Sequence, residues 1–173
     1  MRQTKIFCDI ADSETIRKFN KKKIVNGFTT NPSLMRKAGA KSYEKYSKHL
    51  LKICNKKPIS LEVFADNLKD MEKQALKINS WGKNIYVKIP VINSKGKFTG
   101  KLIKKLNSNK IKLNITAVYT INQVKKINKC LDNKTNSIIS IFSGRMADTG
   151  KDPVPIIKKA IKLTRNKKKV EIL

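Results

Sequence analysis

The sequence predicts an α/β domain of the (β/α)8, or TIM-barrel, class that stops within its seventh strand. Short β-like runs alternate with helix-like runs, which is typical of a parallel sheet with right-handed crossovers. Several strands are polar in one phase and apolar in the other, which favours a barrel over a doubly wound open sheet with two apolar faces. The length of 173 residues suits one domain rather than two. We therefore expect residues 1–173 to form a single barrel domain.

The strands are expected where β-branched and aromatic residues gather between turn residues. The predicted strands are residues 5–11, 24–31, 58–65, 84–93 (ended by Pro90), 111–120, 137–143 and 168–173. Helices are expected to follow all but the last, beginning at typical capping or first-turn residues. The expected starts are Asp12 or Ser13, Pro32, Asn67, the segment 96–100, Thr120, and Asp152 with Pro153. The helix that begins at Pro32 is expected to have a long, interrupted apolar face that reaches Cys54. Residues 144–152 are expected to form a loop before the last of these helices.

The fourth strand places a lysine within an apolar run, NIYVKIPVIN. Ile85, Val87 and Ile89 share one phase of the alternation, and Tyr86 and Lys88 share the other. Burial disfavours the ammonium and favours the nucleophilic free amine, so the stretch suggests Schiff-base catalysis. The alternative is a lysine whose side chain reaches solvent from a strand end.

Other strands carry polar residues in the corresponding phase. The set is Asp9, Glu62, Lys88, Asn114, Thr116 and Ser140. Any one of them could be a hydrogen-bonded polar residue at a strand end. Together with a lysine, they predict an active site at the carboxyl ends of the barrel strands, where barrel enzymes hold their catalytic groups.

The chain is strongly basic, with 40 Lys and Arg against 12 Asp and Glu and a net charge of +28. Such a charge suggests nucleic acid or an acidic membrane surface as a partner. The lysines are scattered, however, and triplets occur only at 21–23 and 167–169, without an arginine-rich arm or interleaved aromatic residues. We therefore expect no specific nucleic-acid partner and no membrane partner. An anionic small substrate is compatible with the charge.

Cysteine and histidine usage excludes several site classes. Cys8, Cys54 and Cys130 form no CxxC pair and are expected to be reduced core thiols, and His49 is the single histidine. We expect no metal site, no cofactor and no histidine-based triad. The first residues contain no apolar run long enough for a signal peptide or a membrane span, so a cytoplasmic location is expected.

Several motifs together resemble the small transaldolases and the related fructose 6-phosphate aldolases, which are class I, Schiff-base enzymes. The resemblance extends from Lys5 to Leu173. It is carried by CDIADSETI at 8–16, GFTTNPSL at 27–34, SLEV at 60–63, NIYVKIP at 84–90, NITAVYT at 114–120 and SIFSGRMAD at 140–148.

The resemblance implies a role for each candidate residue. Lys88 would form the Schiff base, Asp9 would be the acid/base of carbon–carbon cleavage, and Glu62 would act through a water that Thr116 helps to position. Asn31 and Asn114 would hydrogen-bond substrate hydroxyls or the intermediate. Phe142 would line the pocket, and Ser140 and Arg145 would hold the phosphate. The iminium acts as the electron sink, so this chemistry needs no cofactor or metal.

Glu62 and Phe142 distinguish between the two activities of the family that this chain resembles. The transaldolases have Glu at the position of Glu62, whereas the fructose 6-phosphate aldolases have Gln there and Tyr at the position of Phe142. The resemblance thus implies transaldolase activity in the pentose phosphate pathway: sedoheptulose 7-phosphate and glyceraldehyde 3-phosphate give erythrose 4-phosphate and fructose 6-phosphate. The chain departs from the family at Ile10, Ile141 and Ser143, which bears on pocket detail. Fructose 6-phosphate aldolase is the first alternative. An inactive truncated barrel, or a basic nucleic-acid-binding protein, is the second.

The resemblance also implies a longer chain. An eight-unit barrel would need roughly 40 further residues to complete strand 7, strand 8 and the terminal helices. We expect the sequence to be a fragment of such a chain, because an unclosed barrel leaves two exposed edge strands. Small transaldolases form ring-shaped assemblies, so a homo-oligomer is expected for the full-length form.

Overall fold

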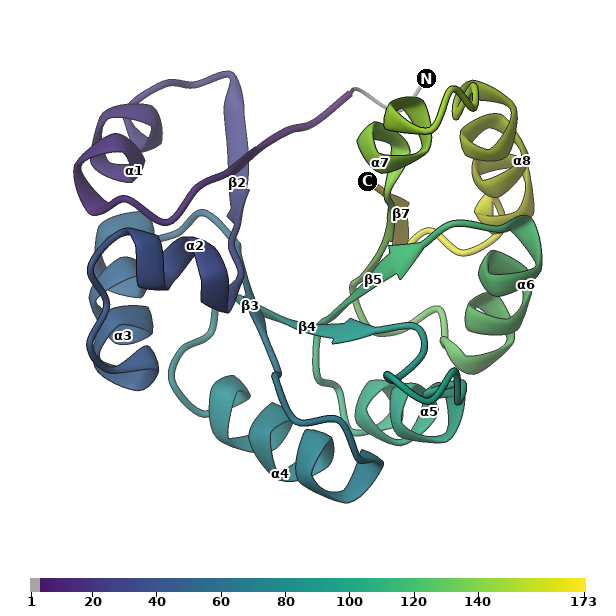
Figure 1. The fold of residues 1–173 in the computed structure, drawn as a ribbon, viewed down its shortest axis with the longest axis horizontal. Coiled ribbons are helices and arrows are strands. Elements are labelled where there is room, and N and C mark those ends of the chain that lie inside the picture. Colours follow the sequence, from purple (N-terminus) through teal and green to yellow (C-terminus); the bar gives the residue numbers. More distant parts are fainter. Residues whose placement is uncertain (1–3) are drawn as a thin grey trace. The chain divides into compact units, whose positions relative to one another are not determined.

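The computed structural model describes residues 4–173, in which strands and helices alternate along the chain (Figure 1). The strands are β1 Ile6–Asp9, β2 Val25–Thr29, β3 Ile59–Glu62, β4 Ile85–Pro90, β5 Leu113–Val118, β6 Ser137–Ile141 and β7 Val170–Ile172. The helices are α1 Ser13–Asn20, α2 Pro32–Lys37, α3 Tyr43–Cys54, α4 Leu68–Asn79, α5 Gly100–Ser108, α6 Ile121–Cys130, α7 Ser143–Asp148 and α8 Val154–Thr164.

The strands pair in sequence order, β1-β2-β3-β4-β5-β6-β7. The pairs β1/β2, β2/β3, β5/β6 and β6/β7 are parallel, as expected when a helix connects successive strands. The prediction of a parallel α/β sheet with alternating helices is therefore confirmed. Seven strands lie in residues 4–173, so an eighth strand is not among the described residues.

Two elements differ from the prediction. The apolar stretch after Pro32 forms two helices rather than one, because Gly39, with φ of 84°, lies between the end of α2 and the start of α3. The expected loop at 144–152 is wrong in its first half, where helix α7 forms. Gly and Asp in that segment suggested a loop, but Gly150, with φ of 74°, lies just after the helix instead.

The described residues divide into two compact units. The first contains the described residues up to Phe64 and then Gln74–Val87, and the second contains Ala65–Lys73 and Lys88–Leu173. In the first unit, α1 packs on α3 and on β2, and α3 packs on β3. Glu44 of α3 accepts hydrogen bonds from two exposed lysines, Lys48 at 2.8 Å and Lys77 of α4 at 2.7 Å.

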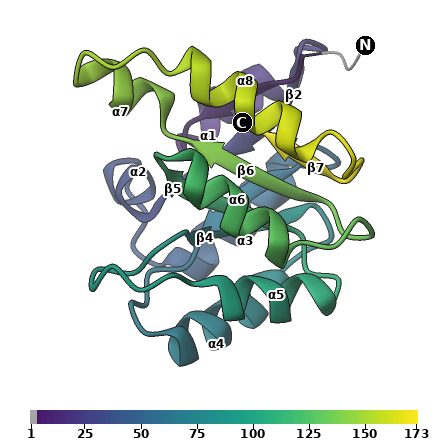
Figure 2. The ribbon, with the colours of Figure 1, turned by 90° about the vertical axis from the view of Figure 1, so that its right-hand side faces the viewer.

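In the second unit, α5 packs on α6 and α6 packs on α8, on the side seen in Figure 2. Asn107, at the end of α5, is buried and holds the segment that leads from α6 into β6. Its Nδ2 donates to Ser137 Oγ at 3.0 Å, and its Oδ1 accepts from the Asp132 backbone N–H at 2.7 Å. These bonds fix the entry to β6, because both partners lie at or just before its first residues.

Helix caps follow the sequence where a side chain was expected to begin a helix. Asp12 Oδ2 accepts from Thr15 N at 2.7 Å, and Asn67 Oδ1 accepts from Asp70 N at 2.9 Å. Thr120 and Gln123 form a capping box at the start of α6. These predictions are confirmed. Among residues 4–173, no helix combines the length and the apolar character needed to cross a bilayer.

Candidate functional site

The first cluster, consisting of Asp9, Asn31 and Glu62, lies at the carboxyl ends of β1, β2 and β3. Register pairs join Asp9 to Thr29 and Thr29 to Ser60. Side chains of paired residues in a parallel sheet point to the same face, and residues two apart on one strand share that face. Asp9, Asn31 and Glu62 therefore share one face of the sheet of this unit.

Asp9 is held by a neighbour that the sequence did not suggest. Thr29 Oγ1 donates a hydrogen bond to Asp9 Oδ1 at 2.8 Å, and Thr29 is 8% exposed whereas Asp9 is exposed. A hydroxyl donor to a carboxylate oxygen fixes the orientation of that carboxylate. Thr29 therefore presents Asp9 in one orientation.

Asn31 has a structural role in addition to the predicted one. Its Oδ1 accepts from Leu34 N at 2.9 Å, so it is the N-cap of α2, with Pro32 in the first turn. Its Nδ2 donates to no residue in the described part of the chain. The capping bond orients the side chain, and the amide nitrogen remains a possible donor to a ligand oxygen.

Glu62 is partly exposed at the end of β3, and its backbone is held from α3. Tyr43 Oη donates to the Glu62 carbonyl oxygen at 2.8 Å, and the Tyr43 ring packs edge-on against Phe64 with centroids 5.4 Å apart. Burial raises the pKa of Tyr43 above its usual value, so the hydroxyl stays a proton donor. The contact fixes the strand end that carries Glu62.

The candidate residues that belong to the second unit are called the second cluster, and they are Lys88, Asn114, Thr116, Ser140, Phe142 and Arg145. Lys88 is 8% exposed, Asn114 is 0% exposed and Thr116 is 1% exposed, and the lysine lies on β4, the neighbour of β5. The low exposure contradicts a side chain that simply extends into solvent. A buried amine beside buried polar groups has the surroundings that nucleophilic catalysis requires.

A β-bulge shapes the end of β5. The register of β5 and β6 pairs Ile115 with Ile139 and then Val118 with Ile141, so Thr116 and Ala117 together oppose Ser140. Ala117 has φ of 57°, a conformation that a non-glycine residue adopts at a cost of about 1 kcal/mol. Bulges of this kind redirect the side chain beside them.

Thr116 Oγ1 is buried and has no hydrogen-bond partner in the described part of the protein. A buried hydroxyl without a partner is costly, which makes it a candidate contact for a water or a ligand. The bulge and this hydroxyl point to the carboxyl end of β5 as a functional position.

The other members of the second cluster are more accessible. Ser140 and Phe142 are partly buried, and the Phe142 ring meets the Tyr119 ring edge-on with centroids 5.6 Å apart. Arg145 lies in α7 and is exposed, with its guanidinium 3.9 Å from Asp148 Oδ2. An exposed guanidinium can bind an anion from solution, since its weak surface ion pair is easily exchanged.

Thr29, Tyr43 and Ala117 are positions that sequence reasoning missed. Thr29 lies two residues before Asn31, so the strand alternation could have assigned it to the same face. Tyr43 and the bulge at Ala117 carry no local signal, because they depend on contacts between distant segments. Within residues 4–173, no three His, Cys, Asp or Glu side chains are grouped so as to hold a metal ion.

Comparison with known proteins assigns these motifs to a family. The family model for Transaldolase/Fructose-6-phosphate aldolase matches residues 6–173. A probable transaldolase of Parabacteroides distasonis is 32% identical over 161 residues, covering 92% of this chain and 70% of that protein. A probable transaldolase of Methanococcus maripaludis strain C5 is 34% identical over 159 residues, covering 92% and 69%. The dihydrodipicolinate synthase structure from Rhodopseudomonas palustris aligns with a TM-score of 0.47 at 11% identity, covering 99% of this chain and 65% of that one.

Proposed function

The chain belongs to the transaldolase/fructose-6-phosphate aldolase family, and we propose that it is a transaldolase that acts through a Schiff base on Lys88. One observation supports this most strongly. Lys88 is buried on β4, and Asn114 and Thr116 are buried on the neighbouring strand β5. Sugar phosphates are the proposed substrates, and the net charge of +28 suits such anions.

The first step forms the covalent intermediate. The Lys88 amine adds to the carbonyl carbon of a ketose phosphate, and loss of water from the carbinolamine gives an iminium ion. Thr116 and Glu62 hold and activate the water that takes part in this step, with Glu62 acting through that water. The unpartnered Thr116 Oγ1 is compatible with this role.

The second step breaks the carbon–carbon bond. Asp9 takes the proton of the hydroxyl next to that bond, the bond electrons move into the iminium, and an aldose phosphate leaves. The dihydroxyacetone unit stays on Lys88 as an enamine. It then attacks the carbonyl carbon of a second aldose phosphate, Asp9 returns the proton to the new alkoxide, and water releases the product. Thr29 holds Asp9 for both transfers.

The remaining candidate residues bind the substrate. Arg145 and Ser140 bind the phosphate, for which a planar guanidinium offers two parallel hydrogen bonds. Asn31 and Asn114 bind hydroxyls or the intermediate, and Phe142 forms the pocket wall. The resemblance of Glu62 and Phe142 to the transaldolase pattern favours transfer of the dihydroxyacetone unit to a second aldose phosphate over its release as free dihydroxyacetone.

The wider setting belongs to the same proposal. The parallel sheet is part of a (β/α)8 barrel that forms one domain, the reaction belongs to the pentose phosphate pathway, and the enzyme works in the cytoplasm as a homo-oligomer. The alternation of strands and helices and the family membership support the barrel.

Product analysis tests the function. With fructose 6-phosphate and erythrose 4-phosphate, we expect sedoheptulose 7-phosphate and glyceraldehyde 3-phosphate, and no free dihydroxyacetone when the acceptor is left out. Lys88→Met should abolish both products, whereas Lys101→Met, which removes an exposed amine on α5, should not. Release of dihydroxyacetone without acceptor would identify an aldolase instead. Equal product from Lys88→Met and the unaltered chain would exclude the Schiff-base mechanism.

A further inference from the structure

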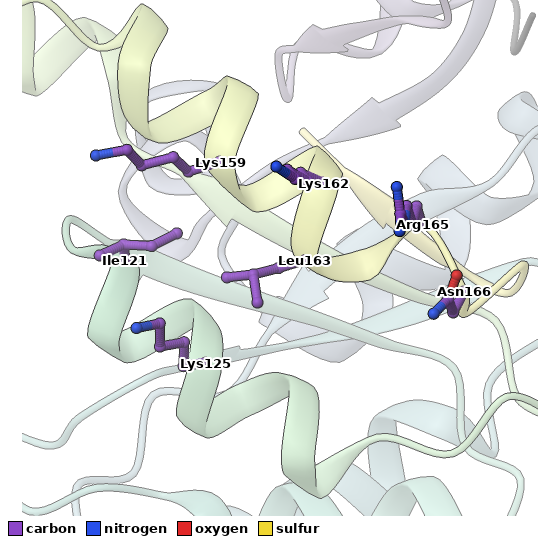
Figure 3. A pocket seen from close by; sticks show the side chains of 7 residues that line it. All are labelled: Ile121, Lys125, Lys159, Lys162, Leu163, Arg165 and Asn166. Carbon is purple, nitrogen blue, oxygen red and sulfur yellow. The ribbon is translucent and has the colours of Figure 1, made fainter.

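An open groove of about 570 Å³ lies between helices α6 and α8 of the second unit (Figure 3). Ile121 and Lys125 of α6 line one side, and Lys159, Lys162 and Leu163 of α8 line the other, with Arg165 at its end. None of these residues belongs to the candidate site. The volume lies in the range of small-ligand pockets.

The groove is lined by cations without carboxylates to balance them. Lys125, Lys159, Lys162 and Arg165 are exposed, and none of them forms an ion pair with a residue in the described part of the chain. Elsewhere in the same unit a cation does find a carboxylate, as Lys105 does with Glu72 at 2.6 Å. The groove therefore offers positive charge that no described side chain neutralises.

Two cations of α8 and the arginine that directly follows it form a row along the helix axis. Lys159, Lys162 and Arg165 are spaced three residues apart, so they lie on neighbouring positions of one helix face over about 9 Å. Like charges at such spacing repel one another and slightly destabilise a helix. An anion with several charges along a comparable length would contact all three and relieve that repulsion.

Hydrogen bonds join α6 to α8 and to the segment that follows α8, so they fix the groove in advance. Asn128 Nδ2 of α6 donates to the Leu163 carbonyl oxygen at 3.4 Å. Lys167 Nζ donates to the carbonyl oxygens of Asn128 and Leu131 at the end of α6. A ligand that enters a preformed groove does not have to order it, which lowers the cost of binding.

We propose that this groove binds small oligophosphates, anions that carry two or more linked phosphate groups. A second copy of this chain is disfavoured in this groove, because four exposed cations line it and the chain carries only 12 Asp and Glu against 40 Lys and Arg. Single-stranded nucleic acid is disfavoured, since no aromatic side chain lines the groove for base stacking. Arg165 supplies a planar fork for phosphate oxygens, and the lysines supply further point charges.

Calorimetric titration with inorganic tripolyphosphate tests the proposal at a fixed low salt concentration. The groove variant carries Lys162→Gln and Arg165→Gln. The control carries Lys52→Gln on α3 and Lys101→Gln on α5, which removes the same charge from exposed positions elsewhere. We expect saturable binding, weakened roughly tenfold in the groove variant and less than about twofold in the control.

Other outcomes would overturn the proposal. Equal weakening in both double variants would mean that the overall charge binds the anion, and a lack of saturation would mean that no site exists. Single-stranded RNA that displaces tripolyphosphate and binds more tightly through the same residues would identify a nucleic-acid surface instead. Urea unfolding of both variants checks that neither has lost its fold. The test does not use Lys88, so its result is independent of the proposed transaldolase activity.

Discussion

Replacing Thr29 by valine should impair catalysis through Asp9 while leaving the strand intact. Valine has nearly the shape of threonine and favours strands, so packing in β2 is retained. The change removes one interaction, the 2.8 Å hydrogen bond from Thr29 Oγ1 to Asp9 Oδ1. Thr29→Ser keeps the hydroxyl and is the matched control.

The expected magnitude follows from the surroundings of this bond. A hydrogen bond to a charged group contributes about 1.5–3 kcal/mol. Asp9 is exposed, so water can replace part of the interaction, and the lower end of the range applies. A loss of about 1.4 kcal/mol in transition-state stabilisation corresponds to a roughly tenfold fall in kcat/KM. Thr29→Ser should stay within about twofold of the unaltered chain.

A double-mutant cycle with Asp9→Asn supplies the assay. Transfer from fructose 6-phosphate to erythrose 4-phosphate is measured for both single variants and for the double variant. If Thr29 acts through Asp9, Thr29→Val should cost little once Asp9 is an asparagine, because the group that it orients has lost its function. The same tenfold cost in both backgrounds would refute the reasoning, as would a matching loss in Thr29→Ser.

Three further predictions concern stability and reactivity. Asn107→Leu removes the bond to Ser137 and leaves the Asp132 N–H without its acceptor, so the free energy of unfolding in urea should fall by about 3 kcal/mol; a change below about 1 kcal/mol would contradict this. Hydrogen bonds from Lys48 and Lys77 lower the pKa of Glu44 from 4.5 to about 2. The charged Glu44 therefore stabilises the folded state above pH 4.5, and this contribution is lost as the pH falls toward 2. Glu44→Gln should therefore lower the urea midpoint near pH 6 but not near pH 2, and a difference that persists in acid would be inconsistent. Burial raises the pKa of the Cys54 thiol to about 12, so a thiol reagent should label it only after unfolding, as peptide mass mapping would show.

The sequence predicted the elements whose signals are local. Alternating apolar residues located every strand, and side chains that can accept from the backbone located the starts of α1, α4 and α6. The apolar run around Lys88 also suggested its burial, with a lysine that reaches solvent as the alternative, and the structure shows Lys88 8% exposed. These features depend on residues only a few positions apart.

Features that depend on distant segments could not be predicted in this way. The hydrogen bond from Thr29 to Asp9 requires the register of two strands, and the bulge at Ala117 requires the register of β5 against β6. Helix α7 was expected to be a loop, because Gly144 and Gly150 dominate its local signal. Asn31 was expected to bind substrate, and its additional role as the cap of α2 became visible only with the backbone in place.

Borohydride trapping tests the central claim most directly. The protein is incubated with fructose 6-phosphate, the Schiff base is reduced, and the modified peptide is identified by mass spectrometry. The account predicts a dihydroxyacetone adduct on Lys88 that is absent in Lys88→Met and present in Lys101→Met. Folded protein that yields no adduct, or an adduct on another lysine that persists in Lys88→Met, would contradict it.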